Sequence, residues 1–187
     1  MIVRDGTLLT AATQVLLRQP TASLAEVAAA TGVSRTTLYS RFPTRQALLV
    51  GLAQAAMDLV EKAYADARLD DAEVGPSLLR VVERLVPLGE RVEFLLRERS
   101  LDDEPEIVAR YVELDGTVIA FVERAQQAGT LRGDLPAWWV VAALMGSVYA
   151  AWEAIADGRL APRDAPALVL GTVLDGVRGT RPAGARP

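Results

Sequence analysis

The sequence predicts an all-α protein of about nine helices, and three observations support this expectation. Apolar residues recur every three or four positions along most of the chain, which is the spacing of one helix face. Ala, Leu, Arg and Glu dominate, whereas strand-like alternation bounded by turns is missing. Glycines and prolines interrupt the apolar pattern often enough to divide it into separate helices.

The composition excludes several kinds of chemistry. The chain has no cysteine and no histidine, so disulfides, thiolate chemistry, histidine acid–base catalysis and His or Cys metal sites are all excluded. We expect no enzyme activity, no cofactor and no metal. The N-terminus lacks an apolar signal segment, and the longest apolar run, Ala137 to Trp152, is shorter than the ~20 residues of a membrane-spanning helix. We therefore expect a cytoplasmic protein in which this run forms a buried helix.

Charge is distributed unevenly between the two ends of the chain. The net charge is −4 overall, but residues 1–50 hold five arginines, one aspartate and one glutamate, a net charge of +3. The remainder is therefore acidic, with a net charge of −7. Such asymmetry suggests a nucleic-acid partner for the first part and a different partner for the rest.

The first 66 residues predict four helices with clear end signals. A helix over 4–18 ends at Gln19-Pro20, and Ser23 with Glu26 forms a capping box for a short second helix. Gly32 supplies the left-handed residue that ends it. Ser34 caps a third helix over 35–41, and Thr44 caps a fourth over 45–66. Two short helices joined by a glycine turn are typical of a helix-turn-helix, although a small helical bundle of another kind has the same signals.

The stretch from Ser23 to Leu49 closely resembles the signature of TetR/AcrR regulators, and the resemblance covers roughly residues 4–52. The matching features are Gly32-Val33-Ser34, Thr37-Leu38-Tyr39, Phe42 and Arg45-x-Ala47-Leu48-Leu49. The resemblance implies a bacterial DNA-binding regulator, mostly a repressor in this family, with a helix-turn-helix domain over 1–48. It implies an effector-binding and dimerisation domain over 49–187, of which we expect the tail 179–187 to be disordered.

The sequence departs from the family pattern at three places. Only Arg4 precedes the first helix, where many members carry a basic arm, which puts contacts to the minor groove in doubt. Gln46 stands where an acidic residue is usual in the first turn of the fourth helix. Gln19-Pro20 replaces the more common glycine after the first helix.

The third helix is the expected DNA-reading element. On a helical wheel Leu38 must point inward, which places Thr36 and Ser40 on the outer face toward the bases. Arg35 suits a guanine contact, with a phosphate contact as the alternative. The expected phosphate contacts are Thr37, Tyr39, Arg41 and Arg45, for two of which, Tyr39 and Arg45, the family resemblance points the same way. Phe42 is expected to pack the third helix onto the first and fourth rather than to touch DNA.

The rest of the chain predicts five helices, over about 75–87, 90–99, 104–128, 137–157 and 163–178. Small residues recur every four positions in the fourth of these, which permits close approach of another helix. We expect a homodimer held by this helix and the last one, with intramolecular packing of the small-residue stripe as the alternative. The expected interface residues are Ala142, Gly146, Ala150, Leu170, Val173, Leu174 and Val177.

A small-molecule pocket is expected around Asp115, because this carboxylate falls among the apolar residues Tyr111, Val112, Val118, Ile119 and Val122. An unpaired carboxylate in a core is costly, so Asp115 lines a pocket, pairs with an arginine or lies at an edge. The expected pocket residues are Phe94, Tyr111, Asp115 and Trp152. Most other aromatic residues are expected in the core.

Three alternatives remain open on the sequence. The acidic run Asp102-Asp103-Glu104 before Pro105 resembles a metal site, but the start of a helix explains it better. A regulator without a small-molecule effector fits the same helix-turn-helix. A helical enzyme would need clustered polar residues in a cavity, and only Asp115 and Glu153 offer themselves.

Overall fold

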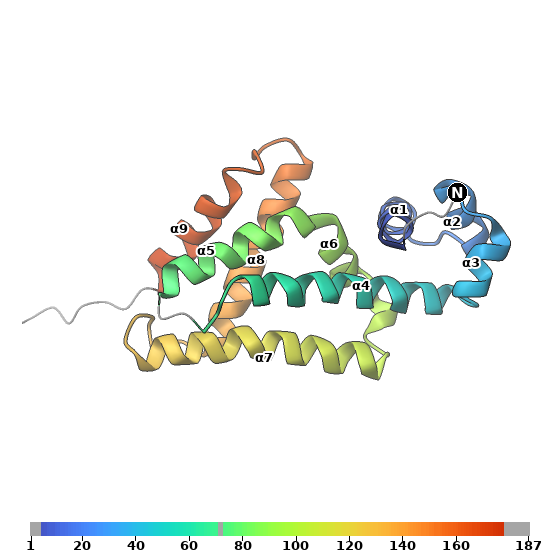
Figure 1. Cartoon of the computed structure of the whole chain (residues 1–187). Coiled ribbons are helices and arrows are strands. Elements are labelled where there is room, and N and C mark those ends of the chain that lie inside the picture. Colours follow the sequence, from blue (N-terminus) through green and yellow to red (C-terminus); the bar gives the residue numbers. More distant parts are fainter. Residues whose placement is uncertain (1–4, 71–72, 178–187) are drawn as a thin grey trace, which may run out of the picture. The chain divides into compact units, whose positions relative to one another are not determined.

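A computed structural model describes residues 5–70 and 73–177, and this part of the chain is helical, as predicted (Figure 1). Arg4 and the tail 179–187 lie outside the described residues. The predicted helix ends agree with the structure to within about three residues. The helices are α1 (Asp5–Arg18), α2 (Leu24–Thr31), α3 (Arg35–Arg41), α4 (Arg45–Asp66), α5 (Val74–Leu85), α6 (Gly89–Arg97), α7 (Pro105–Gln127), α8 (Ala137–Ala156) and α9 (Ala165–Val177), with short 3-10 turns η1 (Val86–Leu88) and η2 (Arg99–Leu101).

The chain forms two compact units, and neither is continuous in sequence. The first combines Met1–Leu59 with Leu88–Tyr111, and the second combines Val60–Pro87 with Val112–Pro187. This division differs from the boundary expected between residues 48 and 49. The reason is that α4 runs without interruption past that point, and α6 packs against α1.

The first unit is built around the three N-terminal helices. The helix α1 packs against α2 and α6, and α2 packs against α3. Apolar side chains at helical spacing on each of these elements close a core. Its fully or nearly fully buried members include Leu8, Ala12, Leu16, Val27, Leu38 and Leu48.

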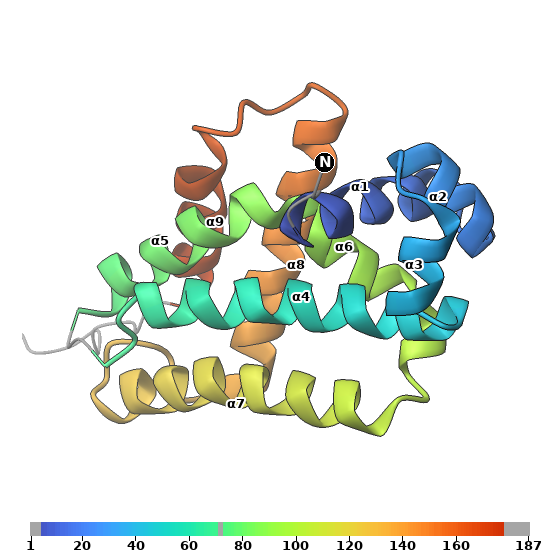
Figure 2. The same cartoon turned by 45° about the vertical axis from the view of Figure 1, so that its right-hand side comes forward.

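The second unit contains α5, α8 and α9, with α9 packed against both of the others (Figure 2). One face of α5 is buried along its whole length, and its partners on α8 and α9 are also large aliphatic residues. Trp152 is buried here, and its indole Nε1 donates a hydrogen bond to the carbonyl oxygen of Val86 at 3.1 Å. The core residues include Leu78, Val81, Val82, Leu144, Val148 and Val169.

Two expectations about buried faces were wrong. Tyr111 and Val112 are exposed, because α7 buries the neighbouring stripe that contains Ile107, Val118 and Val122. The helix α8 was expected to be buried, but only one side of it is. Trp138 and Trp139 at its start are exposed and pack edge-to-face on each other, with ring centroids 5.6 Å apart. By length and composition alone α8 would suffice to cross a membrane, a property that core helices of globular proteins share.

Candidate nucleic-acid interface

The helix α3 has one buried residue and an otherwise exposed surface. Leu38 has no exposed surface, which fixes the rotation of the helix about its axis as predicted. The other side chains of α3 are therefore turned outward, and none of them is acidic. These exposed residues are Arg35, Thr36, Thr37, Tyr39, Ser40 and Arg41.

Local features fix the start of α2 and the turn from α2 into α3. The capping box is present: the Ser23 amide donates to Glu26 Oε2 at 2.7 Å, and the Glu26 amide donates back to Ser23 Oγ at 3.3 Å. The bond from the Ser23 amide, together with one from Ser23 Oγ, holds the pKa of the Glu26 carboxyl below its ordinary value. Gly32 has φ +69°, so the left-handed turn predicted there is confirmed. The capping box thus begins α2, and Gly32 ends it and turns the chain toward α3.

The hydroxyl groups on α3 differ in whether they form hydrogen bonds within the protein. Ser34 Oγ accepts the Thr37 amide at 3.1 Å, and the two side-chain oxygens lie 2.7 Å apart. Ser40 Oγ donates to the Thr37 carbonyl at 2.9 Å. The Thr36 hydroxyl forms no hydrogen bond within the part of the chain that the structure describes. Among the threonine and serine side chains of α3, that of Thr36 is therefore the one without a hydrogen bond to the described residues.

The two basic residues that flank the outer face differ in their surroundings. Arg35 extends from the first turn of α3 into solvent. The guanidinium of Arg41 lies over the ring of Phe42, with its carbon 5.3 Å from the ring centroid. This stacking keeps a positive charge beside the end of the helix.

Arg45 has a structural role that the sequence did not reveal. Its Nε donates to the Ala22 carbonyl at 3.2 Å, and its Nη2 donates to the Pro20 carbonyl. Nη2 also lies 3.8 Å from Glu98 Oε2. Arg45 therefore ties the start of α4 to the link between α1 and α2. The Gln19-Pro20 pair at the end of α1 could have indicated this role of Arg45. A chain that leaves a helix through proline exposes carbonyl oxygens that need hydrogen-bond donors.

Phe42 joins α3 to α4, as expected, and it does so through a glycine that sequence analysis missed. Its ring is buried, and a Cβ added at Gly51 would lie 2.7 Å from Phe42 Cε1. Only a residue without a side chain allows this approach in the middle of α4. A glycine inside a helical pattern could have indicated this contact. Glycine lowers the stability of a helix, and a packing contact compensates for that loss.

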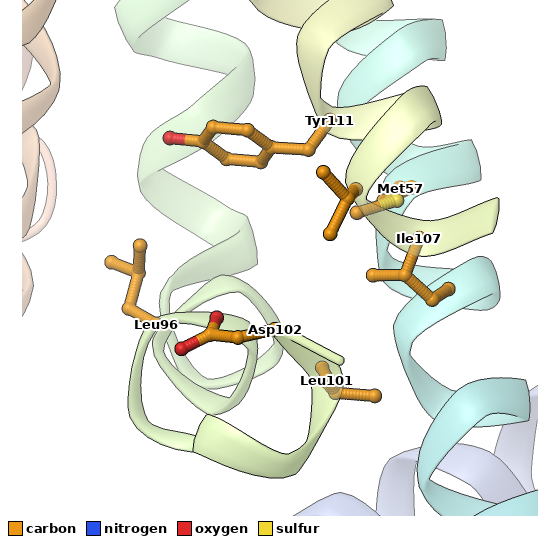
Figure 3. Close-up of a pocket in the computed structure, with 7 residues that line it drawn as sticks. Met57, Leu96, Leu101, Asp102, Ile107 and Tyr111 are labelled. Carbon is orange, nitrogen blue, oxygen red and sulfur yellow. The ribbon is translucent and has the colours of Figure 1, made fainter. Parts of the chain in front are cut away.

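The first unit contains a pocket of about 330 Å³ beside α7 (Figure 3). Tyr111 extends from α7 across it toward the side that carries Leu96 and Asp102, and Met57 lies on α4 (Figure 3). The lining is mostly apolar, with one carboxylate and one phenol. Its residues are Met57, Leu96, Leu101, Asp102, Ile107, Val108 and Tyr111.

Of the four predicted pocket residues, Tyr111 lines this pocket and the other three do not. Phe94 is buried in the first unit, and Trp152 is buried in the second. Asp115 is half-buried in the second unit, and desolvation raises the pKa of its carboxyl above the ordinary value. No described lysine or arginine forms an ion pair with it. Its functional assignment stays a prediction.

The acidic run before α7 serves the fold. As expected, the helix begins at Pro105 directly after this run, with Glu106 in its first turn. Asp102 Oδ2 lies 3.6 Å from Arg99 Nη1, and Glu104 Oε1 accepts a hydrogen bond from Gln46. Within the described ranges, no three acidic side chains are grouped so as to hold a metal ion.

The predicted dimer residues divide into two groups. Ala142, Gly146 and Ala150 are exposed along one side of α8, and a Cβ at Gly146 would meet nothing within 4 Å, so intramolecular packing does not explain this stripe. On α9, Leu170 and Leu174 are half-buried. Val173 is 6% exposed and packs inside the protomer, so it offers little surface to a second copy. The side chain of Val177 lies outside the described residues. Leu168, which the sequence did not single out, is 58% exposed on the same helix.

Comparison with known proteins assigns the family. Residues 8–52 match the family model "Bacterial regulatory proteins, tetR family". The chain is 36% identical over 151 residues to the HTH-type transcriptional repressor LfrR of Mycolicibacterium smegmatis, which covers 81% of this chain and 78% of that protein. The resemblance seen in the sequence is thus confirmed over most of the chain.

Solved structures agree with this assignment. A crystal structure of the TetR-like regulator LfrR from Mycobacterium smegmatis in complex with proflavine matches with TM-score 0.74 and 30% identity, covering 94% of this chain and 98% of that one. The ketosteroid regulator KstR2 of Mycobacterium tuberculosis matches in fold, with TM-score 0.78, 18% identity and coverage of 96% and 97%. The chain belongs to the TetR family of bacterial regulatory proteins and is a DNA-binding transcriptional regulator.

Proposed function

We propose that the protein is a homodimeric repressor that binds a palindromic operator and is released by a small-molecule effector. The observation that carries the DNA-binding part is the outer face of α3, which presents six exposed polar or basic side chains on a helix fixed by Leu38. Such a helix fits the major groove and reads base edges there. A regulator of this kind acts on the chromosome, which places it in the cytoplasm.

Each α3 residue has a proposed role that follows from its surroundings. Thr36 and Ser40 face the bases, with the uncommitted Thr36 as the main determinant of sequence preference. Arg35 contacts guanine or a phosphate. The proposed phosphate contacts are Thr37, Tyr39, Arg41 and Arg45, although Arg45 and Thr37 already serve the protein through the bonds described above.

The roles of Thr36 and Arg45 can be separated by two variants. Thr36→Ala should change the preferred base at one position in each half-site, at a cost of about 1 kcal/mol for the original base. Arg45→Lys should weaken binding to all sequences alike and lower the melting temperature, because an ammonium group cannot reproduce the guanidinium fork that holds Pro20 and Ala22. Operators are selected from genomic fragments with the purified protein, and each variant is then measured on single-base substitutions. A lysine variant with normal stability and affinity would mean that Arg45 provides only charge.

The dimer proposal rests on the exposed apolar surface of α8 and α9. Trp139 is 53% exposed, and the neighbouring exposed positions along α8 are the small residues Ala142, Gly146 and Ala150. A contiguous apolar surface of this kind marks an interaction site. A second copy fits it best, since one DNA-reading unit contacts few phosphates and two units are needed for specific binding.

The effector proposal rests on two separate features, one in each unit. The first unit holds the apolar pocket beside Tyr111, which falls at the lower end of the volumes typical of small-molecule sites. The second unit holds the desolvated carboxylate of Asp115. The apolar lining of the pocket favours an aromatic effector. Independently of the pocket, a desolvated carboxylate without an ion-pair partner among the described residues favours a cationic one. Proflavine, the ligand of the related LfrR structure, has this chemistry.

Replacing the Asp115 carboxylate should raise stability and lower effector affinity together. Because burial raises the folded-state pKa of Asp115, its ionised form penalises folding above that pKa, and the penalty disappears as the pH falls through it. Asp115→Asn should therefore raise the free energy of unfolding at pH 7, with a gain that shrinks in acid. Proflavine binding, followed by fluorescence, should weaken by about tenfold.

A matched control for this variant is Glu113→Gln, which removes the same charge from an exposed position on the same helix. It should leave both stability and proflavine affinity nearly unchanged. Equal loss of proflavine affinity in the two variants would mean that the effect comes from net charge alone. A stability difference between Asp115→Asn and the wild type that does not change with pH would contradict the desolvation of the Asp115 carboxylate.

A further inference from the structure

A groove in the second unit lies between the end of α4 and the second half of α7. The two helices lie side by side there and run in the same direction (Figure 1 and Figure 2), and Arg124 of α7 contacts Leu69, which follows α4. The groove has a volume of about 400 Å³, which is within the range of small-molecule sites. It shares no lining residue with the pocket beside Tyr111, so it is a separate cavity.

The groove carries opposite charges at its two ends. Glu61 stands at one end, whereas Arg68 and Arg124 line the other, where two arginines against Asp70 leave a net charge of +1. Glu61 precedes Arg68 by seven residues, a separation of about 10 Å at the helical rise. A ligand that lies along the groove thus meets a negative charge, a mostly apolar floor and a positive charge in turn. The residues between the two ends include Ala65, Leu114, Thr117 and Ala120.

Arg68 has a backbone conformation that disfavours a side chain. Its φ is +52°, and among the described residues it is the one non-glycine residue with a positive φ. A glycine would adopt this left-handed conformation without strain. The Arg68 side chain is exposed, lines the groove and forms no hydrogen bond or ion pair with the described residues. Contacts within this part of the protein therefore do not account for an arginine here, which points to a role in binding.

Arg124, in contrast, is fixed in place by the fold. Its Nη2 donates to the Leu69 carbonyl at 3.0 Å and lies 3.7 Å from Asp70 Oδ1, and its guanidinium carbon lies 6.0 Å from the centroid of the Phe121 ring. The side chain is 53% exposed, and most of its five N–H donors form no hydrogen bond with the described residues. Arg124 thus offers a preorganised partner for an anionic group, at the same end of the groove as Arg68.

We propose that this groove binds a zwitterion whose ammonium and carboxylate groups are about 10 Å apart. The carboxylate contacts Arg68 and Arg124, the ammonium group contacts Glu61, and the chain between them lies against α4 and α7. A ligand with only one kind of charge meets one attractive and one repulsive end, so the charge pattern selects molecules that carry both. The site goes beyond the proposed function, in which a different pocket and the Asp115 carboxylate favour an aromatic cation.

The probe for this site is 8-aminooctanoate, whose charged groups are about 10 Å apart in the extended chain. Isothermal titration calorimetry with the full-length protein measures its affinity at low salt, because exposed ion pairs are screened as salt rises. Octanoate and octylamine each lack one of the two charged groups, and 4-aminobutanoate is too short to reach both ends of the groove. We expect each of these three molecules to bind more weakly than 8-aminooctanoate by about fivefold or more.

Two variants assign the two ends of the probe. Glu61→Gln should lower the affinity for 8-aminooctanoate by about fivefold but should not lower that for octanoate, which has no ammonium group. Arg68→Gly should lower the affinity for 8-aminooctanoate and for octanoate but not that for octylamine. The glycine variant should also melt about 2–4 °C higher, because it relieves the left-handed strain at position 68. A gain in stability together with a loss of binding separates a ligand-binding role of Arg68 from a structural one.

The matched control is Glu123→Gln, which removes a carboxylate from an exposed position on α7 outside the lining of the groove. It should leave all four affinities unchanged. The proposal would be overturned by equal affinities for the four probes, by no measurable binding of 8-aminooctanoate, or by an Arg68→Gly protein that melts lower and binds like the wild type. None of these results bears on operator binding, which the selection of genomic fragments tests separately.

Discussion

Gly146→Leu is expected to convert the protein from a dimer into a folded monomer and to reduce operator affinity by about a hundredfold or more. Gly146 lies in the middle of the exposed small-residue stripe of α8, where a larger side chain would hold a second helix away. The loss is large because two linked half-sites bind far more tightly than either one alone.

The protomer itself should tolerate this change. A Cβ at Gly146 would meet nothing within 4 Å, and leucine favours a helix more than glycine by about 0.8 kcal/mol. Gly116→Leu is the matched control, because Gly116 is an exposed glycine in α7 with equally open surroundings. Sedimentation velocity at micromolar concentration measures the assembly state. A Gly146→Leu protein that sediments like the wild type would exclude the α8 stripe as the interface.

Gly51→Ala should destabilise the protein and weaken DNA binding, although glycine-to-alanine changes within helices normally stabilise by about 1 kcal/mol. The new methyl would lie 2.7 Å from Phe42 Cε1, and because the Phe42 ring is buried, it has to shift against the side chains packed around it. Overpacking of this kind costs about 1–3 kcal/mol, which exceeds the gain in helix propensity. Because Phe42 ends α3, relief of the clash should also shift the DNA-reading helix.

The control for this prediction is Gly116→Ala, which makes the same substitution in open space within α7. Thermal unfolding should show a higher melting temperature for Gly116→Ala and a lower one for Gly51→Ala, and only the latter should lose operator affinity. If Gly51→Ala stabilised the protein as much as Gly116→Ala, the Phe42–Gly51 contact would not hold α3 in place.

The helix-turn-helix was predictable from the sequence because its signals are local. The capping pair Ser23 and Glu26, the left-handed Gly32 and the cap at Ser34 act within a few residues of one another, so spacing alone identifies them. Leu38 is the only large aliphatic residue of α3, which fixed the rotation of that helix and hence its outer face.

The errors arose where one helix has more than one apolar stripe. In α7 the apolar residues cover more than half of the circumference, so spacing could not choose between the stripe of Tyr111 and Val112 and the stripe of Ile107 and Val118, which the fold buries. For the same reason the sequence did not show that Val173 on α9 is buried within the protomer. The structural roles of Arg45, Gln46 and Gly51 were missed because they depend on tertiary contacts, with Pro20, Glu104 and Phe42 respectively.

The most direct measurement of the central claim compares the affinity of the full-length protein for a selected operator and for a scrambled duplex of equal length across a range of salt concentrations. Arginine contacts to phosphates release counterions, so log affinity should fall linearly with log salt for both duplexes. The operator should bind about a thousandfold more tightly, with two protein chains per duplex. Equal affinity for the two duplexes, or affinity independent of salt, would contradict a sequence-specific DNA-binding function for α3.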